Sequence, residues 1–226
     1  MPRESYQDQL DSMQAAVLDM GDVVTARLRL ALDAMADQDE AAARDVIAGD
    51  EEINDIYLDL EEECIDLLAL QQPVAGDLRL IAASFKILTD LERVGDLAVN
   101  FAQYALDAER GTAPEIDVET IGDLTVGMIG DAMAAYDAHD DDACYGIAER
   151  DDTLDDRCAR ASQSIVRELI ETELDDDGSG ERAEALMRDV SRLLLTVRDL
   201  ERVGDHAVNI AARTLYMVEN DEELIY

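Results

Sequence analysis

The sequence predicts an all-α protein of two tandem antiparallel three-helix bundles, six long helices in all, related by an internal pseudo-twofold repeat. Three observations support this fold class. The 226 residues include only 3 prolines and 12 glycines, so few positions interrupt a helix. Apolar residues make up 48% of the chain and recur at steps of three and four, the pattern of a core-facing helix. A thirteen-residue stretch occurs twice, which indicates two similar halves.

The repeated stretch reads DLERVGDLAVNFA at 90–102 and DLERVGDHAVNIA at 199–211, with eleven of thirteen positions identical at an offset of 109. An apolar seam runs through each copy and skips two positions, which are held by Glu92 and Gly95 and by Glu201 and Gly204. We expect these seam residues in the core: Leu78, Ile81, Phe85, Leu88, Val99, Ala102 and Leu106, then Met187, Val190, Leu194, Val197, Val208, Ala211 and Leu215. A glutamate at a core position in both halves requires a physical reason.

The first half is expected to contain three helices. Residues 5–36 form a long helix, and Asp39 caps the second helix, which runs to about residue 70. Pro73 starts the third helix, where its missing N–H would be unpaired in any case. This helix carries the first copy of the repeat and ends near Gly111.

The second half mirrors the first. Asp50 matches Asp151 at an offset of 101, whereas the repeats are 109 apart, so eight residues (109 − 101) are inserted, most simply in a polar loop at 175–180. Short connections make neighbouring helices antiparallel, and the halves should pack into one elongated molecule. The domains are residues 1–112 and 113–226, divided within the breaker-rich stretch 110–114.

The formal net charge of −37 comes from 55 acidic and 18 basic residues spread along the whole chain, and Lys86 is the only lysine. This charge indicates adaptation to a salt-rich cytoplasm, and it repels nucleic acid and anionic membranes. No apolar run approaches the roughly 18 residues of a membrane span, and residues 1–10 lack the pattern of a secretory signal. We therefore expect a soluble cytoplasmic protein that binds no nucleic acid and does not insert into a membrane.

A second polar ridge lies on the helix before each repeat. Asp50 and Asn54 are four residues apart, so they lie one above the other on a helix face. At 1.5 Å per residue in an antiparallel pair, Asp50 reaches the height of Asp96, and Asn54 reaches that of Glu92. Gly95 removes a side chain where the two helices approach. The same count sets Asp151 and Asp155 against Asp205 and Glu201.

Carboxylates that converge without enough bases repel one another unless one is protonated or a cation binds. Oxygen ligands suit Mg, Mn, Ca or iron, and zinc also accepts them. The alternative is a metal-free network in which Glu92 and Glu201 pair with Arg93, Arg202 or an arginine of another helix. The candidate metal ligands are Glu92, Asp96, Glu201, Asp205, Asp50, Asn54, Asp151 and Asp155.

We expect no catalytic activity, because the sequence contains no nucleophile–base pair and no phosphate-cradling glycine loop. The Glu-x-x-His spacing of di-iron bundles is missing, since His206 adjoins Asp205 and His139 falls in an expected loop. A carboxylate-metal hydrolase or oxidase would need an open coordination position and a perturbed acid or base. The cysteines, Cys64, Cys144 and Cys158, lack CxxC spacing and are expected as small buried residues.

Over essentially its whole chain the sequence resembles the PhoU family. The resemblance rests on Leu-Glu-Arg-Val-Gly-Asp at 91–96 and 200–205, Gly49-Asp50 to Asn54, and Gln72-Pro73 through Asp77-Leu78-Arg79. It implies two three-helix bundles whose Glu/Asp-x-x-x-Asp motifs hold multinuclear iron or zinc clusters. On this chain it implicates Glu92, Asp96, Glu201 and Asp205, with Asp50, Asn54, Asp151 and Asp155 as the partner ridge. Asn54 departs from the acidic pattern.

The resemblance also implies a function in phosphate signalling. A member of this family is a cytoplasmic regulator that restrains phosphate uptake when phosphate is plentiful, by contacting the ATPase subunit of the phosphate ABC transporter. Many members also contact a sensor kinase. We expect a homodimer as well, with no residue of the sequence singled out for its interface.

Overall fold

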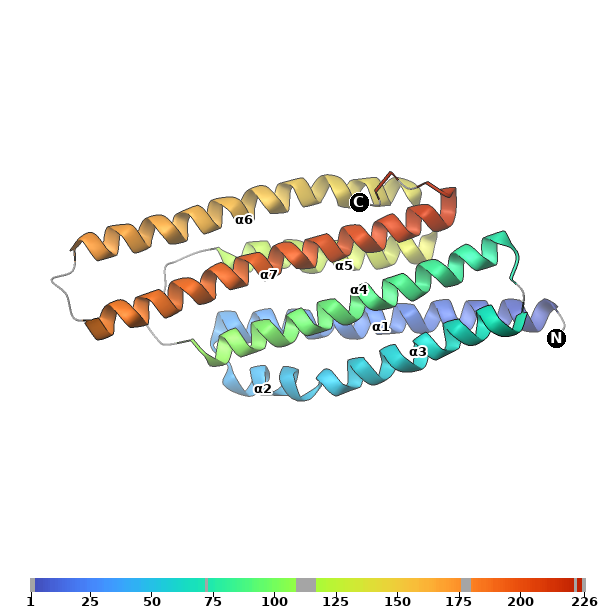
Figure 1. Ribbon diagram of the computed structural model, residues 1–226, viewed down its shortest axis with the longest axis horizontal. Helices are drawn as coiled ribbons and strands as arrows, with labels where there is room; N and C mark the ends of the chain where they lie inside the picture. The colour runs from blue at the N-terminus through green and yellow to red at the C-terminus, as the bar shows by residue number, and fades with distance from the viewer. Residues whose placement is uncertain (1–2, 72, 109–116, 176–179, 222, 225–226) are drawn as a thin grey trace.

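The computed structural model describes residues 3–71, 73–108, 117–175, 180–221 and 223–224. These residues form helices and no strand, and Figure 1 shows two bundles side by side, α1 to α4 and α5 to α7, with α4 and α7 in the middle. The predicted fold class is confirmed. No helix in this part of the chain has the length and apolarity to cross a membrane. The helices are α1 Arg3–Asp37, α2 Glu40–Ala48, α3 Asp50–Gln71, α4 Ala75–Leu106, α5 Val118–Ala138, α6 Asp141–Asp175 and α7 Gly180–Glu219.

The second of the six expected helices is broken at Gly49 into α2 and α3, which corrects the prediction of one continuous helix. The guanidinium of Arg27 fills the space that a Cβ on Gly49 would need. From there Arg27 donates to the Val46 carbonyl at 3.3 Å and pairs with Glu52 at 2.9 Å. In the second half the equivalent position is Arg150, and α6 runs through it without a break. Asp50 therefore starts a helix, whereas Asp151 lies inside one.

Several expected helix ends are confirmed and others move by a few residues. The Asp39 carboxylate accepts from the backbone N–H groups of Ala41 and Ala42 at 2.9 and 3.1 Å, which confirms the cap of α2. The helix α4 starts at Ala75 instead of Pro73, and it ends at Leu106 instead of near Gly111. The boundary region 110–114 and most of the loop 175–180 lie outside the described residues, so the division at 112 and 113 stays a prediction.

The central helices bury a wider face than the predicted seam. Leu78 and Met187 were expected in the core, yet their side chains are 46% and 54% exposed. Leu91 and Phe101, outside the seam, are fully buried. The reason is that α4 packs against α1, α2, α3 and α7, so one heptad seam cannot describe its buried face. Glu92 consequently lies half-buried at the border of that face.

The two halves are joined by a reciprocal hydrogen-bond network between α4 and α7. Asp90 of α4 bonds His206 Nδ1 at 2.9 Å and accepts from Asn209 Nδ2 at 3.2 Å. Asp199 of α7 accepts from Asn100 Nδ2 at 3.3 Å. Both aspartates are buried, and they occupy the same position of the two repeats, as do the two asparagines. Each copy of the repeat therefore contributes an aspartate and an asparagine to the contact between the two halves.

Tyr104 strengthens the network, because its hydroxyl donates to Asp199 at 2.8 Å in the buried interface. We expect Tyr104→Phe to lower the free energy of unfolding by about 1 kcal/mol, and Asp199→Ala to lower it by about 2–4 kcal/mol, since a buried partner is left unpaired. Urea unfolding measures both changes. Tyr145→Phe, which removes an exposed hydroxyl 3.4 Å from Glu223, is the control and should cost less than about 0.5 kcal/mol.

The double variant Tyr104→Phe/Asp199→Ala tests whether the hydroxyl of Tyr104 stabilises the protein through Asp199. Its cost should be smaller than the sum of the two single costs, because Tyr104 has no carboxylate to bond once Asp199 is gone. Fully additive costs would contradict the coupling.

Candidate metal centre

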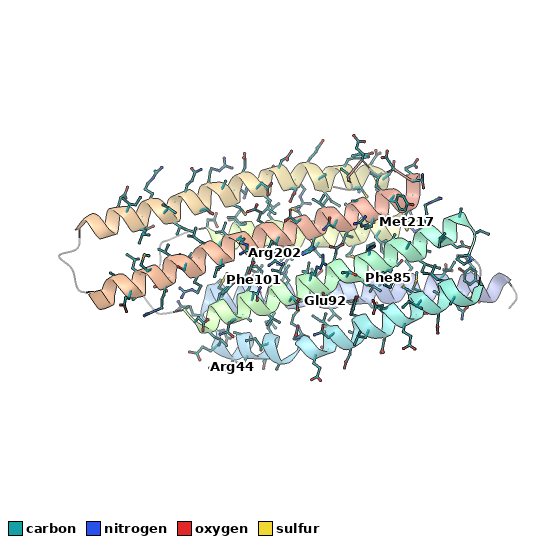
Figure 2. The ribbon with its side chains drawn as sticks, in the orientation of Figure 1. Arg44, Phe85, Glu92, Phe101, Arg202 and Met217 are labelled. Atoms are coloured by element: carbon teal, nitrogen blue, oxygen red, sulfur yellow. The ribbon has the colours of Figure 1, made fainter. Side chains whose placement is uncertain are left out.

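In the first half the two ridges meet where α3 begins against the middle of α4. Asp50 lies in the first turn of α3, and Asn54 Nδ2 donates to Asp50 Oδ2 at 3.2 Å across one helical turn. Glu92 and Asp96 come from α4, where Figure 2 labels Glu92 beside α3. Glu92 is half-buried and Asp96 is exposed, so this group of side chains opens to solvent.

In the second half the corresponding group joins α6 and α7. Asp151 is half-buried, whereas Asp155, Glu201 and Asp205 are exposed. Gly204 fulfils the role expected of the motif glycine, because a Cβ there would lie 2.7 Å from Asp151 Oδ1. It would also collide with Leu154. The absence of a side chain at Gly204 therefore lets Asp151 lie against the backbone of α7.

Asp151 carries the largest perturbation among these carboxyl groups. Burial, and after it the negative charges of Asp155 and Asp205, raises the pKa of Asp151 from 3.8 to about 7. Its Oδ1 atom is buried and has no hydrogen-bond partner among the described residues. An ionised carboxylate in this place is costly unless a proton or a cation compensates it.

Glu92, Asp96, Glu201 and Asp205 also have raised pKa values. Burial is the first cause in each case, and the second is a neighbouring ridge carboxylate: Asp96 raises the pKa of Glu92, and Asp50 raises that of Asp96. In the second half, the charge of Asp155 raises the pKa of both Glu201 and Asp205. The structure thus brings the ridges of each half within electrostatic reach of each other.

The arginines form no ion pair with these glutamates in the described part of the chain. Within the described ranges neither Glu92 nor Glu201 makes an ion pair, and Arg202 instead pairs with Asp199 at 3.1 Å. The metal-free network proposed as an alternative for the two glutamates is therefore not formed. The asparagines Asn100 and Asn209 bond across the bundle, as their simplest role predicts.

The oxygen donors are of a type that suits a metal ion, but the described side chains form no ligand group for one: no three His, Cys, Asp or Glu residues among them are arranged to hold an ion. The fit rests on the unpartnered Asp151 Oδ1 and on oxygen donors that raise one another's pKa. The residues that would hold metal are Asp50, Asn54, Glu92 and Asp96 in the first half, and Asp151, Asp155, Glu201 and Asp205 in the second.

The cysteines play no part in these groups as ligands. All three are free and buried, as expected. Burial raises the pKa of the Cys64 and Cys158 thiols to about 12, so both stay protonated, whereas a metal ligand must be a thiolate.

Sequence reasoning missed the interface network, above all Asp90, Asp199, His206 and Tyr104. One signal was available: the repeat retains its first aspartate and its asparagine ten residues later, and neither is needed for the Glu-x-x-x-Asp ridge. The residues packed opposite each aspartate come from the other half. Only the contact between the halves reveals them.

The fold and the facing ridges define the class of protein. It is an internally repeated helical bundle with a group of carboxylate side chains in each half. The chain belongs to the PhoU family, because the family model for the PhoU domain matches it twice, at residues 17–105 and 118–214. A relative from Pseudomonas putida, named as a phosphate-specific transport system accessory protein PhoU homolog, is 33% identical over 97% of this chain and 82% of its own length.

Two solved structures agree with this assignment. The crystal structure of PhoU from Pseudomonas aeruginosa superposes with a TM-score of 0.85 at 32% identity, over 96% of this chain and all (100%) of that one. The phosphate transport system regulatory protein PhoU from Streptococcus pneumoniae also gives a TM-score of 0.85, at 26% identity over 96% of this chain and 98% of that one.

The raised pKa of Asp151 predicts a pH-dependent stability of the metal-free protein. In the unfolded chain this carboxyl ionises near pH 4, but in the folded protein it ionises only near pH 7. The folded state therefore binds more protons between these values, and its stability falls as the pH rises from about 4 to 7. Asp151→Asn should raise Tm at pH 8, and this gain should shrink towards pH 4.

Thermal unfolding in chelator at a series of pH values measures the effect. Asp156→Asn is the matched control, because Asp156 is exposed on the same helix and is not among the charges that raise the pKa of Asp151. A Tm gain of Asp151→Asn that is the same at pH 4 and pH 8, or equal to that of the control, would contradict the assignment.

Proposed function

We propose that this protein is an accessory regulator of phosphate transport and phosphate signalling, which restrains the phosphate ABC transporter by contacting its ATPase subunit. The observation that carries the proposal is the double match to the PhoU domain, together with a relative that bears the accessory-protein name and matches nearly the whole chain. A sensor kinase is the second partner proposed. The protein acts in the cytoplasm by contact and without catalysis.

The metal-binding part of the proposal rests on the two carboxylate groups. A bound cation, iron or zinc by family resemblance or else Mg, Mn or Ca, would supply the positive charge that these groups lack. Asp151 and Asp155 would bind the ion from α6, and Glu201 and Asp205 would bind it from α7. The bound ion would therefore hold these two helices together. The first group would do the same for α3 and α4 with one amide in place of a carboxylate.

A metal-free helical adaptor is the second candidate. It is favoured by the open arrangement of the described ridges, in which no three acidic or other ligand side chains stand ready for an ion. In that case a proton would compensate the buried carboxyl of Asp151, whose pKa is raised to about 7.

Metal content distinguishes the two candidates. Protein purified without chelator or affinity-tag metal should retain metal by elemental analysis, and Glu92→Gln/Glu201→Gln should lose most of it, because each half loses one carboxylate ligand. Glu62→Gln/Glu168→Gln is the matched control, because both glutamates are exposed on α3 and α6 outside the ridges, and it should keep the metal. If the native chain holds no metal and the first variant folds unchanged, the metal-free adaptor is the correct one of the two.

Capture of the ATPase tests the regulatory role directly. The immobilised protein should retain the purified ATPase subunit of the phosphate transporter at the salt concentration of the cell, and its addition should lower ATP hydrolysis by the transporter. An ATPase subunit from an unrelated transporter is the control. Failure to retain the phosphate-transporter ATPase under these conditions would refute the proposal.

A further inference from the structure

The central helices α4 and α7 differ in charge from the rest of the chain. Together they hold nine of the 18 bases but only 11 of the 55 acids, so their net charge is −2 (9 − 11). The rest of the chain therefore carries −35 of the total of −37. Three of the 11 acids, Asp90, Asp189 and Asp199, are also buried. Bases thus balance acids on these two helices alone, in the middle of a strongly acidic molecule.

The bases of α4 follow the edge of the helix that contacts α7. They form a row at steps of seven residues, or almost two helical turns: Arg79, Lys86, Arg93 and then Asn100. Asn100 donates to Asp199 of α7, so the row lies on the edge beside α7. Arg79 agrees with this assignment, because its Nε donates to the Met217 carbonyl of α7 at 3.2 Å.

A second row lies on the facing edge of α7, at the equivalent positions of the repeat. At the offset of 109 it consists of Arg188, Leu195, Arg202 and Asn209. Asn209 donates to Asp90 of α4, so this row lies beside α4, and Figure 2 labels Arg202 between the two helices. Arg213 follows Asn209 by four residues. Lys86 precedes Asp90 by four, so the two bases come to similar heights in the antiparallel pair.

Most bases of these rows lack a carboxylate partner. We call the set the basic strip: Arg79, Lys86, Arg93, Arg188, Arg198, Arg202 and Arg213. Lys86, Arg93, Arg198 and Arg213 make no ion pair in the described part of the chain. The first three are exposed, and Arg213 Nε is buried without a hydrogen-bond partner among the described residues. In a chain with about three acids for every base, these cations are available to a charge from outside.

Acidic ridges border the basic strip on both sides. Glu92 and Asp96 lie on the side of α4 towards α3, and Glu201 and Asp205 lie on the side of α7 towards α6. Packed helix axes are about 8–10 Å apart, so the strip between the ridges has room for one helix about 10–12 Å across. A membrane surface or a nucleic-acid duplex is wider and would bring its phosphates against the ridges. The charge pattern therefore favours a single acidic helix of a protein.

The strip also offers apolar contacts. At the end near Arg188, a hollow of about 570 Å³ is lined by Tyr104 of α4 and by Met187 and Leu195 of α7, among other residues. The Met187 and Leu195 side chains are 54% and 41% exposed. Leu78, the repeat equivalent of Met187, is 46% exposed at the other end. Apolar contacts of this kind supply attraction, while the charges determine partner and register.

We propose that the basic strip is the surface on which an acidic helix of the ATPase subunit docks. Carboxylates about seven residues apart on that helix face the two rows, about 10.5 Å apart along each, and an apolar side chain enters the hollow. The inference rests on the proposed regulatory function and adds the surface and the chemistry of the partner. The net charge of −37 repels an acidic partner at a distance, but salt screens this repulsion beyond about 10 Å at 0.1 M.

Charge reversal tests the surface through the Kd of the purified ATPase subunit at the salt concentration of the cell. Lys86→Glu/Arg198→Glu should weaken binding roughly tenfold or more, because two attractive contacts become repulsive. Lys86→Arg/Arg198→Lys, which keeps both charges, should bind like the native chain. Arg160→Glu/Arg167→Glu is the matched control: it makes the same charge change at exposed bases of α6 and should leave the Kd unchanged.

Far-ultraviolet circular dichroism establishes that each variant folds. Equal weakening by the strip variant and the control would overturn the proposal, because net charge and not the strip would then govern binding. Unchanged binding by the strip variant would also overturn it, yet would leave the regulatory role intact, whereas a native chain that does not bind the ATPase subunit would refute both. Binding to phosphatidylglycerol vesicles or to DNA that only the strip variant loses, with ATPase binding unchanged, would assign the strip to a different partner.

Discussion

The contact between α4 and α7 is the constraint on which the rest of the molecule depends. Two antiparallel helices from the two halves exchange buried hydrogen bonds through the same positions of one repeat: Asp90 with Asn209, and Asp199 with Asn100. Buried carboxylates must be satisfied, so the halves can dock in only one register. That register orients the outer face of each central helix towards α3 or α6, and the carboxylate ridges lie there.

Each copy of the repeat therefore makes two sets of contacts, on two sides of its helix. Its aspartate and asparagine join the halves, while its Glu-x-x-x-Asp ridge faces the neighbouring helix of its own half. The glycine between them permits close approach, as Gly204 does for Asp151. The halves are nevertheless unequal. The break at Gly49 places Asp50 at the start of α3, whereas Asp151 lies within α6. The pKa of Asp151 is raised to about 7, and its Oδ1 lacks any hydrogen-bond partner in the described structure.

The exposed faces of the two halves differ in charge more than their cores differ in packing. The cores of the two halves are similar because both must bury the same helix faces, but their outer helices diverged in charge. Asp59 and Asp66 on α3 stand where Arg160 and Arg167 stand on α6.

The sequence by itself determined the helical class, the internal repeat, the cap at Asp39 and the facing heights of the ridges, since these depend on local periodicity and on counting residues along antiparallel helices. It also led to the family. It did not determine which faces of α4 and α7 are buried, because each of these helices packs against several neighbours and not along one seam, so Leu78 and Met187 were misplaced. The break at Gly49 depends on Arg27 of another helix. The partners of Asp90 and Asp199 depend on the docking of the two halves. Only the tertiary structure decided these points, because each is set by contact between residues distant in sequence.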